Sequence, residues 1–186
     1  TTARRQRQMC IRDRFKNRAE EQNNLEAPII RKPFFCSGCP HNSSLKVPEG
    51  KRALGGIGCH YMAVDSIEST EFFTQMGGEG TPWIGIAPFS HEKHVFANLG
   101  DGTYKHSGIL AIRASLDANV NITYKILYND AVAMTGGQEI GSNWDVEGIV
   151  KQVLAEGVKK VSILSEDPKR YNLSLIHISE PTRLAG

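Results

Sequence analysis

Two polar loops follow two successive apolar strands near the middle of this chain, and this pattern limits the folds open to it. Residues 94–100 form an apolar run, HVFANLG, that leads directly into the turn Gly100-Asp101-Gly102. A helical pattern over 106–119, an expected strand at 121–128 and the loop Asn129-Asp130 come next. Strand–helix–strand units of this kind build parallel sheets, and both loops then leave the same edge. The chain is therefore expected to form an α/β fold with a doubly wound parallel sheet.

The flanking segments continue the alternation of strands and helices. Before the two polar loops, we expect a short strand at RALGG, a weak helix over 61–74 and a glycine-rich loop over 76–89 in which Trp83 is exposed. After them, we expect a helix from Val146 to about Ala155, capped by Asp145 and ended by Gly157. A further strand is expected at VKKVSIL. Residues 34–173 make up this domain, and residues 15–33 are expected to be a linker into it.

The two polar loops carry the residue types that hold a metal-bound diphosphate. We expect Asp101 to supply a carboxylate oxygen, Asn129 its side-chain carbonyl and Ala131 a backbone carbonyl to Mg²⁺. Gly102 and the amide of Thr103 would lie close to a phosphate at the start of a helix. We place Asp101 on an exposed loop, where its substitution would cost little stability. An ordinary turn or helix cap is the alternative for each loop taken alone.

The spacing of Gly100-Asp101-Gly102 and Asn129 resembles the thiamin diphosphate motif, in which GDG is followed some two dozen residues later by Asn. This resemblance names a cofactor, thiamin diphosphate, and with it the Mg²⁺ ion.

Three cysteines form a second group of candidate ligands. Cys36 and Cys39 share a CxxC turn, and Cys59 ends a glycine-rich loop. Structural cysteines are one reading, and a zinc site with His41 or His60 as fourth ligand is another. An iron–sulfur cluster usually needs four thiolates, so its fourth ligand would lie beyond Tyr171. The sequence leaves these alternatives open.

Composition and charge exclude several classes of protein. The net charge of +2 comes from residues 1–14, which carry +4, so the rest of the chain is slightly acidic and offers no basic footprint for nucleic acid. No apolar run is long enough to span a membrane, and because the basic residues 1–14 are not followed by an apolar stretch, we expect no secretion signal. We expect a cytoplasmic protein. Residues 1–14, with Cys10, and residues 174–186 show no pattern that fits the domain and are expected to be non-native or a disordered arm and tail.

Five segments together resemble the 2-oxoacid:ferredoxin oxidoreductases, above all their indolepyruvate-type members. These are FCSGCPHNSS, ALGGIGCHYM, FTQMGGEGTPWIG, HVFANLGDGTYKHSG and ITYKILYNDAVAMTGGQ, within residues 33–171. The resemblance implies the diphosphate-binding domain of such an enzyme. It assigns cofactor contacts to Cys59, Gly100, Asp101, Gly102, Thr103, Asn129, Asp130, Ala131, Val132, Ala133 and Met134, and iron–sulfur ligation, in a [4Fe-4S] cluster, to Cys36, Cys39 and Cys59. His41 departs from the glutamate of pyruvate-type relatives.

The same resemblance implies oxidative decarboxylation of a 2-oxo acid, with coenzyme A taking the acyl group and ferredoxin the electrons. It also implies a homo-oligomeric parent enzyme whose pyrimidine-binding domain lies outside this fragment, so the fragment alone is expected to be inactive. A cluster-free thiamin diphosphate-dependent decarboxylase or transferase and a non-enzymatic zinc-binding module are the alternative functions.

Overall fold

The computed structural model describes residues 33–67, 69–141, 145–171 and 177–179. The chain divides into two units, residues 1–32 and 33–186, and all described residues belong to the second. The predicted arm at 1–14, with Cys10, and the predicted linker up to residue 32 therefore lie outside the described residues.

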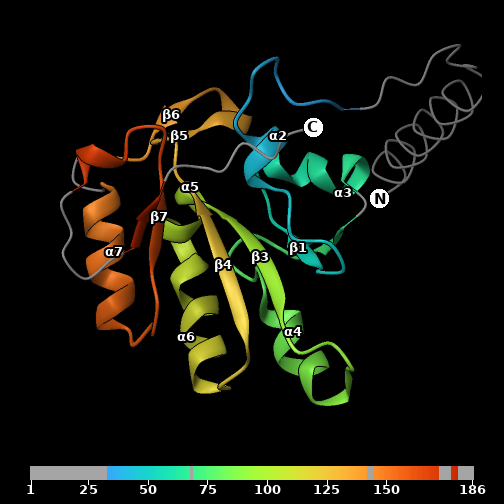
Figure 1. The fold of residues 1–186 in the computed structure, drawn as a ribbon. Helices are drawn as coiled ribbons and strands as arrows, with labels where there is room; N and C mark the ends of the chain where they lie inside the picture. The colour runs from blue at the N-terminus through green and yellow to red at the C-terminus, as the bar shows by residue number, and fades with distance from the viewer. Residues whose placement is uncertain (1–32, 68, 142–144, 172–176, 180–186) are drawn as a thin grey trace, which may run out of the picture. The chain divides into compact units, whose positions relative to one another are not determined.

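Four parallel strands form the central sheet, in the order β2-β1-β3-β4 (Figure 1). Their bounds are Ala53–Gly55 for β1, Thr70–Phe73 for β2, Val95–Gly100 for β3 and Ile122–Leu127 for β4. β3 and β4 pair over their whole length, from Val95 opposite Ile122 to Gly100 opposite Leu127. The expected parallel α/β sheet is confirmed, and the loops after these two strands start side by side at its carboxyl edge.

Three helices pack against one face of the sheet: α4 (Thr81–Ile86), α6 (Ile109–Asp117) and α7 (Val146–Ala155). The larger core cluster joins β3 to α6 and α7 and consists of Leu99, Tyr104, Ile112, Ile149 and Val153. A smaller cluster of Leu54, Trp83 and Val95 joins β1 and β3 to α4. Val95, Ala97 and Leu99 alternate along β3 and are nearly inaccessible to solvent, so this strand anchors both clusters.

The predicted helix α7 is confirmed, together with the residues that begin and end it. The carboxylate of Asp145 accepts a hydrogen bond from the Gly148 amide at 2.7 Å, which satisfies one of the free donors of the first turn. Gly157, with a φ of +97°, follows the last turn in the left-handed conformation that glycine adopts most easily.

Two predictions about local structure are wrong. Residues 61–74 do not form one helix, because a short helical segment ends at Ser66 and strand β2 begins at Thr70. Residues 76–89 are not a loop, because α4 starts after Gly80 with proline in its first turn, a position that favours helix initiation. Trp83 is therefore buried, at 4 % exposure, and its Nε1 donates to the carbonyl of Asn121 at 3.1 Å.

The remaining elements are short. They are the helices α2 (His41–Ser44), α3 (Ala63–Ser66) and α5 (Asp101–Thr103), the 3₁₀ turns η1 (Cys59–Met62), η2 (Ala87–Phe89), η4 (Ala133–Thr135) and η5 (Pro168–Arg170), the π-helical turn η3 (Tyr104–Gly108), and the strands β5 (Ala131–Val132), β6 (Gln138–Glu139), β7 (Ser162–Leu164) and β8 (His177–Ser179). β5 and β6 form an antiparallel pair, whereas β7 and β8 pair in parallel outside the central sheet. β8 falls within the predicted tail.

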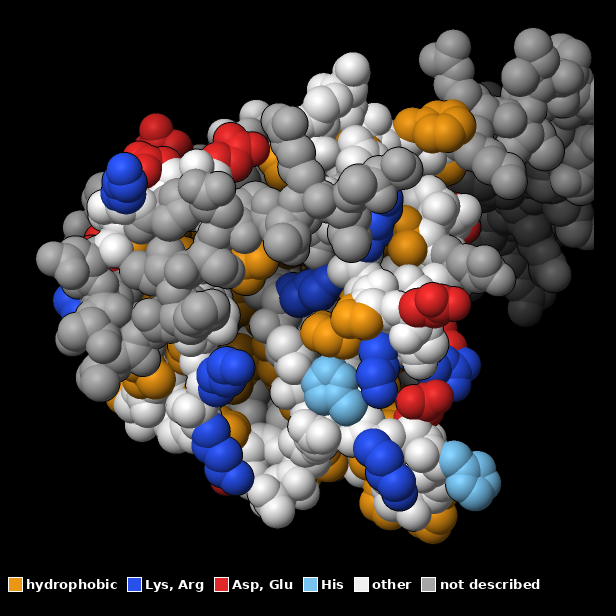
Figure 2. Space-filling model, viewed as in Figure 1, with side chains coloured by type: hydrophobic (Ala, Val, Ile, Leu, Met, Phe, Trp, Pro, Cys, Tyr) orange, Lys and Arg blue, Asp and Glu red, His pale blue; other side chains and the backbone are white. Residues whose placement is uncertain are grey.

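The visible surface mixes charges of both signs. In Figure 2, Lys and Arg side chains are interspersed with Asp, Glu and hydrophobic side chains. Among the described residues, no helix has the length and apolar character needed to cross a bilayer.

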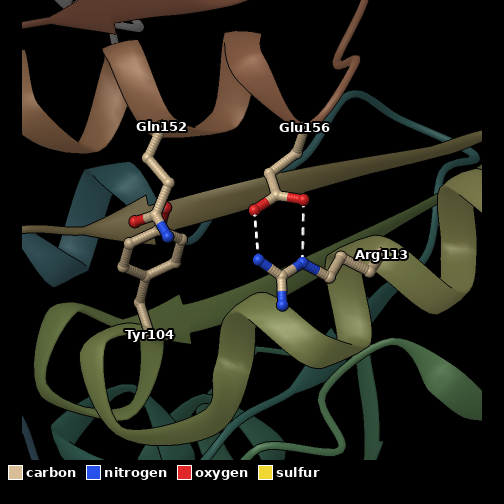
Figure 3. Close-up of polar contacts among 4 residues, drawn as sticks. All are labelled: Tyr104, Arg113, Gln152 and Glu156. Carbon is tan, nitrogen blue, oxygen red and sulfur yellow. Dashed lines mark hydrogen bonds and ion pairs between the residues drawn. The ribbon is translucent and has the colours of Figure 1, made fainter.

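Polar contacts fasten α7 to the helix that follows the GDG turn (Figure 3). Tyr104 donates to the side-chain oxygen of Gln152 at 3.0 Å, and burial raises the pKa of this tyrosine to about 12, so it stays a donor. Arg113 forms a bidentate ion pair with Glu156, in which Nε donates to one carboxylate oxygen at 2.7 Å and Nη2 donates to the other. This contact lowers the pKa of Glu156. These contacts hold the start and the middle of the helix against α7.

Candidate functional site

Loops from three strands meet at the carboxyl edge of the sheet. β1 leads into Gly56–Gly58, β3 into Asp101, and β4 into Asn129. A side chain at Gly56 would collide with the backbone carbonyl of Asn98 on β3, so only glycine allows this close approach. This is the edge at which open α/β sheets bind their ligands.

The carboxylate of Asp101 connects the end of β3 to the loop after β4. Its Oδ1 accepts a hydrogen bond from the Gly102 amide at 2.8 Å. Its Oδ2 accepts from the amides of Asn129 at 2.8 Å and Asp130 at 2.7 Å. Hydrogen bonds from N–H groups to a charged carboxylate are stronger than those between neutral partners. The predicted meeting of Asp101 with the Asn129 loop is therefore present as a direct contact.

The expectation that Asp101 lies on an exposed loop is wrong. Its exposure is 5 %, because the loop after β4 folds over it. Replacing Asp101 by alanine would remove the acceptor for three amides, and a hydrogen bond to a charged group contributes about 1.5–3 kcal/mol. Alanine at this position is thus a poor probe of metal binding.

The loop from Asn129 to Met134 divides into two parts. Asn129 Oδ1 accepts from the Ala131 amide at 3.1 Å, and Asp130 has a φ of +55°, so the loop turns sharply beside Asp101. Val132 reaches back to the GDG turn, since a Cβ on Gly102 would lie 3.2 Å from its Cγ2. Ala133 and Met134 are exposed, on the 3₁₀ turn η4 beyond this contact.

The donor set at this edge fits a magnesium-bound diphosphate. A carboxylate or amide oxygen has two lone pairs, and Asp101 Oδ1 and Asn129 Oδ1 each accept one hydrogen bond from the described residues. The helical segment that begins at Asp101 continues through η3 to Asp117, so its positive end faces the same edge. Gly102 and the buried Thr103 form its first turn, where a phosphate can approach the backbone.

Cys36, Cys39 and Cys59 are free thiols at the amino-terminal side of the domain. Cys36 is exposed, and the other two are half-buried. Burial raises the pKa of Cys59, and its interaction with Cys39 and Cys36 raises it further. Across the described ranges, however, no three or more His, Cys, Asp or Glu side chains form a ready-made metal centre. The iron–sulfur assignment thus stays a prediction.

Two histidines lie beside these cysteines. His60 is 2 % exposed, its ring stands edge-on to His41 at 6.1 Å, and its Nε2 has no hydrogen-bond partner among the described residues. Burial, together with His41, lowers the pKa of His60 to about 4, so the imidazole is neutral at pH 7. A side chain at Gly58 would strike this ring, which explains the glycine before Cys59.

Sequence reasoning missed two charged residues near the site, Glu79, which is buried, and Lys125, which is half-buried. Glu79 is fully buried in the GGEG loop, where one carboxylate oxygen accepts from the Gly77 amide at 2.7 Å and the other has no described partner. Lys125, on β4, is held by two backbone carbonyls. A charged residue inside a glycine-rich or apolar segment was the only signal that could have singled them out.

Comparison with known proteins agrees with this geometry. Residues 56–162, more than half of the chain, match the C-terminal TPP-binding domain of thiamine pyrophosphate enzymes. The chain belongs to the thiamine pyrophosphate enzymes. Thiamine pyrophosphate is another name for thiamin diphosphate, so the cofactor expected from the GDG pattern is confirmed at the level of the family.

The curated relatives of this TPP-binding domain include subunit IorA of indolepyruvate oxidoreductase from several archaea. The Archaeoglobus fulgidus protein is 29% identical over 163 residues, covering 77% of this chain and 26% of the relative. The Thermococcus kodakarensis protein is 27% identical over 150 residues, covering 70% of this chain and 23% of the relative. The chain thus spans about a quarter of the length of these relatives. No solved structure matches it.

Glu79 makes the stability of the TPP-binding domain depend on pH. Burial raises its pKa above that of an exposed glutamate, so protonated Glu79 stabilises the fold at pH values below about 4.5, and this contribution is lost as the pH rises through the raised pKa. Glu79→Gln carries no charge at any pH. The difference in unfolding free energy between Glu79→Gln and the wild type should therefore shift in favour of the variant between pH 4 and pH 7, by about 1.4 kcal/mol for each unit of pKa shift.

Urea denaturation at a series of pH values measures this difference. The exposed Glu49→Gln is the matched control and should show no such trend. A pH-independent difference for Glu79→Gln would mean that Glu79 is charged and satisfied in the folded domain.

Proposed function

We propose that this chain is the TPP-binding part of an indolepyruvate-type 2-oxoacid:ferredoxin oxidoreductase and that Asp101, Asn129 and the Ala131 carbonyl hold the Mg²⁺ ion of its cofactor. The observation that carries the proposal is the buried Asp101 carboxylate, fixed by amides from both strand ends with a lone pair of Oδ1 available to a cation. When bound, thiamin diphosphate supplies the carbanion chemistry that cleaves carbon–carbon bonds next to a carbonyl.

The residues of this chain would bind and orient the diphosphate end of the cofactor. Asp101 and Asn129 offer oxygens of the kind that Mg²⁺ prefers, while the first turn of the following helix offers its positive end to phosphate. Val132 lies beside Gly102, since a Cβ on this glycine would be 3.2 Å from Val132 Cγ2. Cys59, Gly100, Asp130, Ala133 and Met134 are the further predicted contacts.

Electron transfer is the finer part of the proposal. Cys36, Cys39 and Cys59 would ligate a [4Fe-4S] cluster that passes electrons to ferredoxin, with a fourth thiolate from another part of the parent enzyme. The IorA relatives are subunits of an indolepyruvate oxidoreductase, which supports an aryl 2-oxo acid as substrate, and coenzyme A would accept the acyl group. A homo-oligomeric, cytoplasmic parent enzyme belongs to the same proposal.

A cluster-free thiamin diphosphate enzyme is the second candidate. It is favoured by the fact that the described residues contain no group of three metal-ligating side chains in position to hold an ion. Anaerobic reconstitution with iron and sulfide, carried out on a longer form of the enzyme that includes the fourth thiolate, separates the two. A cluster gives the protein a brown colour, which the wild-type form should acquire and its Cys36→Ser, Cys39→Ser variant should not.

Substitution of Asp101 by asparagine tests the magnesium site. Asparagine keeps one acceptor oxygen and nearly the same shape but removes the negative charge, so Mg²⁺-dependent binding of thiamin diphosphate should weaken about tenfold or more. Isothermal titration with and without EDTA measures the affinity. Asp117→Asn is the control, because residue 117 is exposed and lies at the carboxyl end of α6, at the opposite end of the helical segment from Asp101. Equal affinity of Asp101→Asn and wild type would remove Asp101 from the site.

Residues 1–186 alone should not oxidise 2-oxo acids. In thiamin enzymes, a separate pyrimidine-binding domain supplies the glutamate that activates the aminopyrimidine, and we infer that this domain lies elsewhere in the parent protein. Reduction of an artificial electron acceptor, with thiamin diphosphate, Mg²⁺, coenzyme A and indolepyruvate present, is the assay. Turnover on the order of 10 per second, as in ordinary enzymes, would show that the chain holds a complete active site.

A further inference from the structure

Lys125 is a half-buried cation on β4 whose hydrogen bonds go to backbone carbonyls of a distant segment. Its Nζ donates to the carbonyl of Ser44 at 2.9 Å and to that of Lys46 at 2.8 Å. The same ammonium group lies 5.2 Å from the centre of the Phe96 ring, within the range of a cation–π contact. Burial lowers the pKa of Lys125 to about 8, as expected for a cation that has given up much of its hydration.

The two carbonyls belong to the segment that carries the CxxC turn. We call residues 36–46 the cysteine segment. Cys39 donates its amide to the carbonyl of Cys36 at 3.0 Å, and Asn42 donates to that of Cys39 at 3.1 Å, so the turn runs without a break into α2. The carbonyls of Ser44 and Lys46 follow at the carboxyl end of this helix, where a cation is favourable. Lys125 therefore binds the carboxyl-terminal end of the cysteine segment, away from the thiols of Cys36 and Cys39.

The other end of this contact lies on the strand that leads to the diphosphate edge. Lys125 pairs with Asn98 across β3 and β4, and β4 ends two residues later, before the Asn129 loop that binds Asp101. On the thiol side, His41 meets the ring of His60, the residue next to Cys59. The cysteine segment is thus held at two points, by Lys125 and by the histidine pair.

We propose that Lys125 is a positioning residue that holds the Cys36–Cys39 turn against the Cys59 loop and at a fixed place relative to the Asp101–Asn129 edge. This positioning role is argued from the contacts above. Its purpose, to give electrons a short path from the cofactor to the cluster, rests on the proposed function. A lysine suits this role because it satisfies two carbonyls at once with one flexible, charged donor group.

Thiol accessibility tests this role without any cofactor. In the reduced, metal-free chain, iodoacetamide modification of each cysteine is followed by peptide mass spectrometry. Lys125→Met keeps the bulk of the side chain but removes the donor, so the cysteine segment should open more often, and the half-buried Cys39 and Cys59 should react about tenfold faster. Cys36 is already exposed and should change little, which makes it an internal reference.

Two further variants make the result decisive. Lys151→Met, on the exposed face of α7, should leave all three rates unchanged. Lys125→Arg keeps a charged donor and should protect Cys39 and Cys59 better than Lys125→Gln does. If Lys125→Met melts like the wild type by circular dichroism yet leaves the rates of Cys39 and Cys59 unchanged, the proposal is wrong. If that variant does not fold, equal rates in the Arg and Gln variants would overturn it.

This experiment also separates the inference from the proposed function. A wild-type chain that fails to bind thiamin diphosphate would count against the function, while faster modification of Cys39 and Cys59 in Lys125→Met would still establish the positioning role.

Discussion

The buried carboxylate of Asp101 is the contact on which the rest of the site depends. It accepts three backbone hydrogen bonds, one from its own helix turn and two from the loop after the neighbouring strand. These bonds turn two adjacent strand ends into one rigid edge. They also leave a lone pair of Asp101 Oδ1 unused by the described residues, next to a glycine turn and the positive end of a helix. The elements behind this edge, with Leu99 and Tyr104 in the core, keep it in place.

The TPP-binding domain combines this edge with a cysteine segment that packs on the same sheet. Lys125 lies on β4, and Asn129 lies on the loop that follows it. The same stretch of chain therefore binds the cysteine segment through Lys125 and contacts Asp101 through Asn129. A thiamin enzyme that transfers electrons needs its cofactor and its acceptor at a constant distance. Under the proposed function, the contacts around β4 meet that requirement, and the pyrimidine half of the active site is proposed to lie in another part of the parent enzyme.

Much of the site could be predicted from the sequence because its signals are local. The apolar strand before GDG, the helix cap at Asp145 and the spacing to Asn129 each follow from short-range chemistry. Burial was harder to predict: Trp83 and Asp101 looked exposed, yet packing across β1 and β3 and the fold of the Asn129 loop enclose them. The helix at Thr81–Ile86 was hidden by its one proline and its one glycine, Pro82 and Gly85. Lys125 and Glu79 were missed because they bind backbone groups, and a sequence does not show which backbone groups a side chain will contact.

Amide chemical shifts of the ¹⁵N-labelled chain test the central claim most directly. If the Asp101 edge holds the magnesium-bound diphosphate, the amides of Gly102, Asn129 and Asp130, which hydrogen-bond to this carboxylate, should shift when Mg²⁺ and thiamin diphosphate are added together. Either component alone should produce much smaller shifts. If these three amides stay unchanged while signals elsewhere in the domain move, the cofactor binds at another place and the account given for Asp101 is wrong.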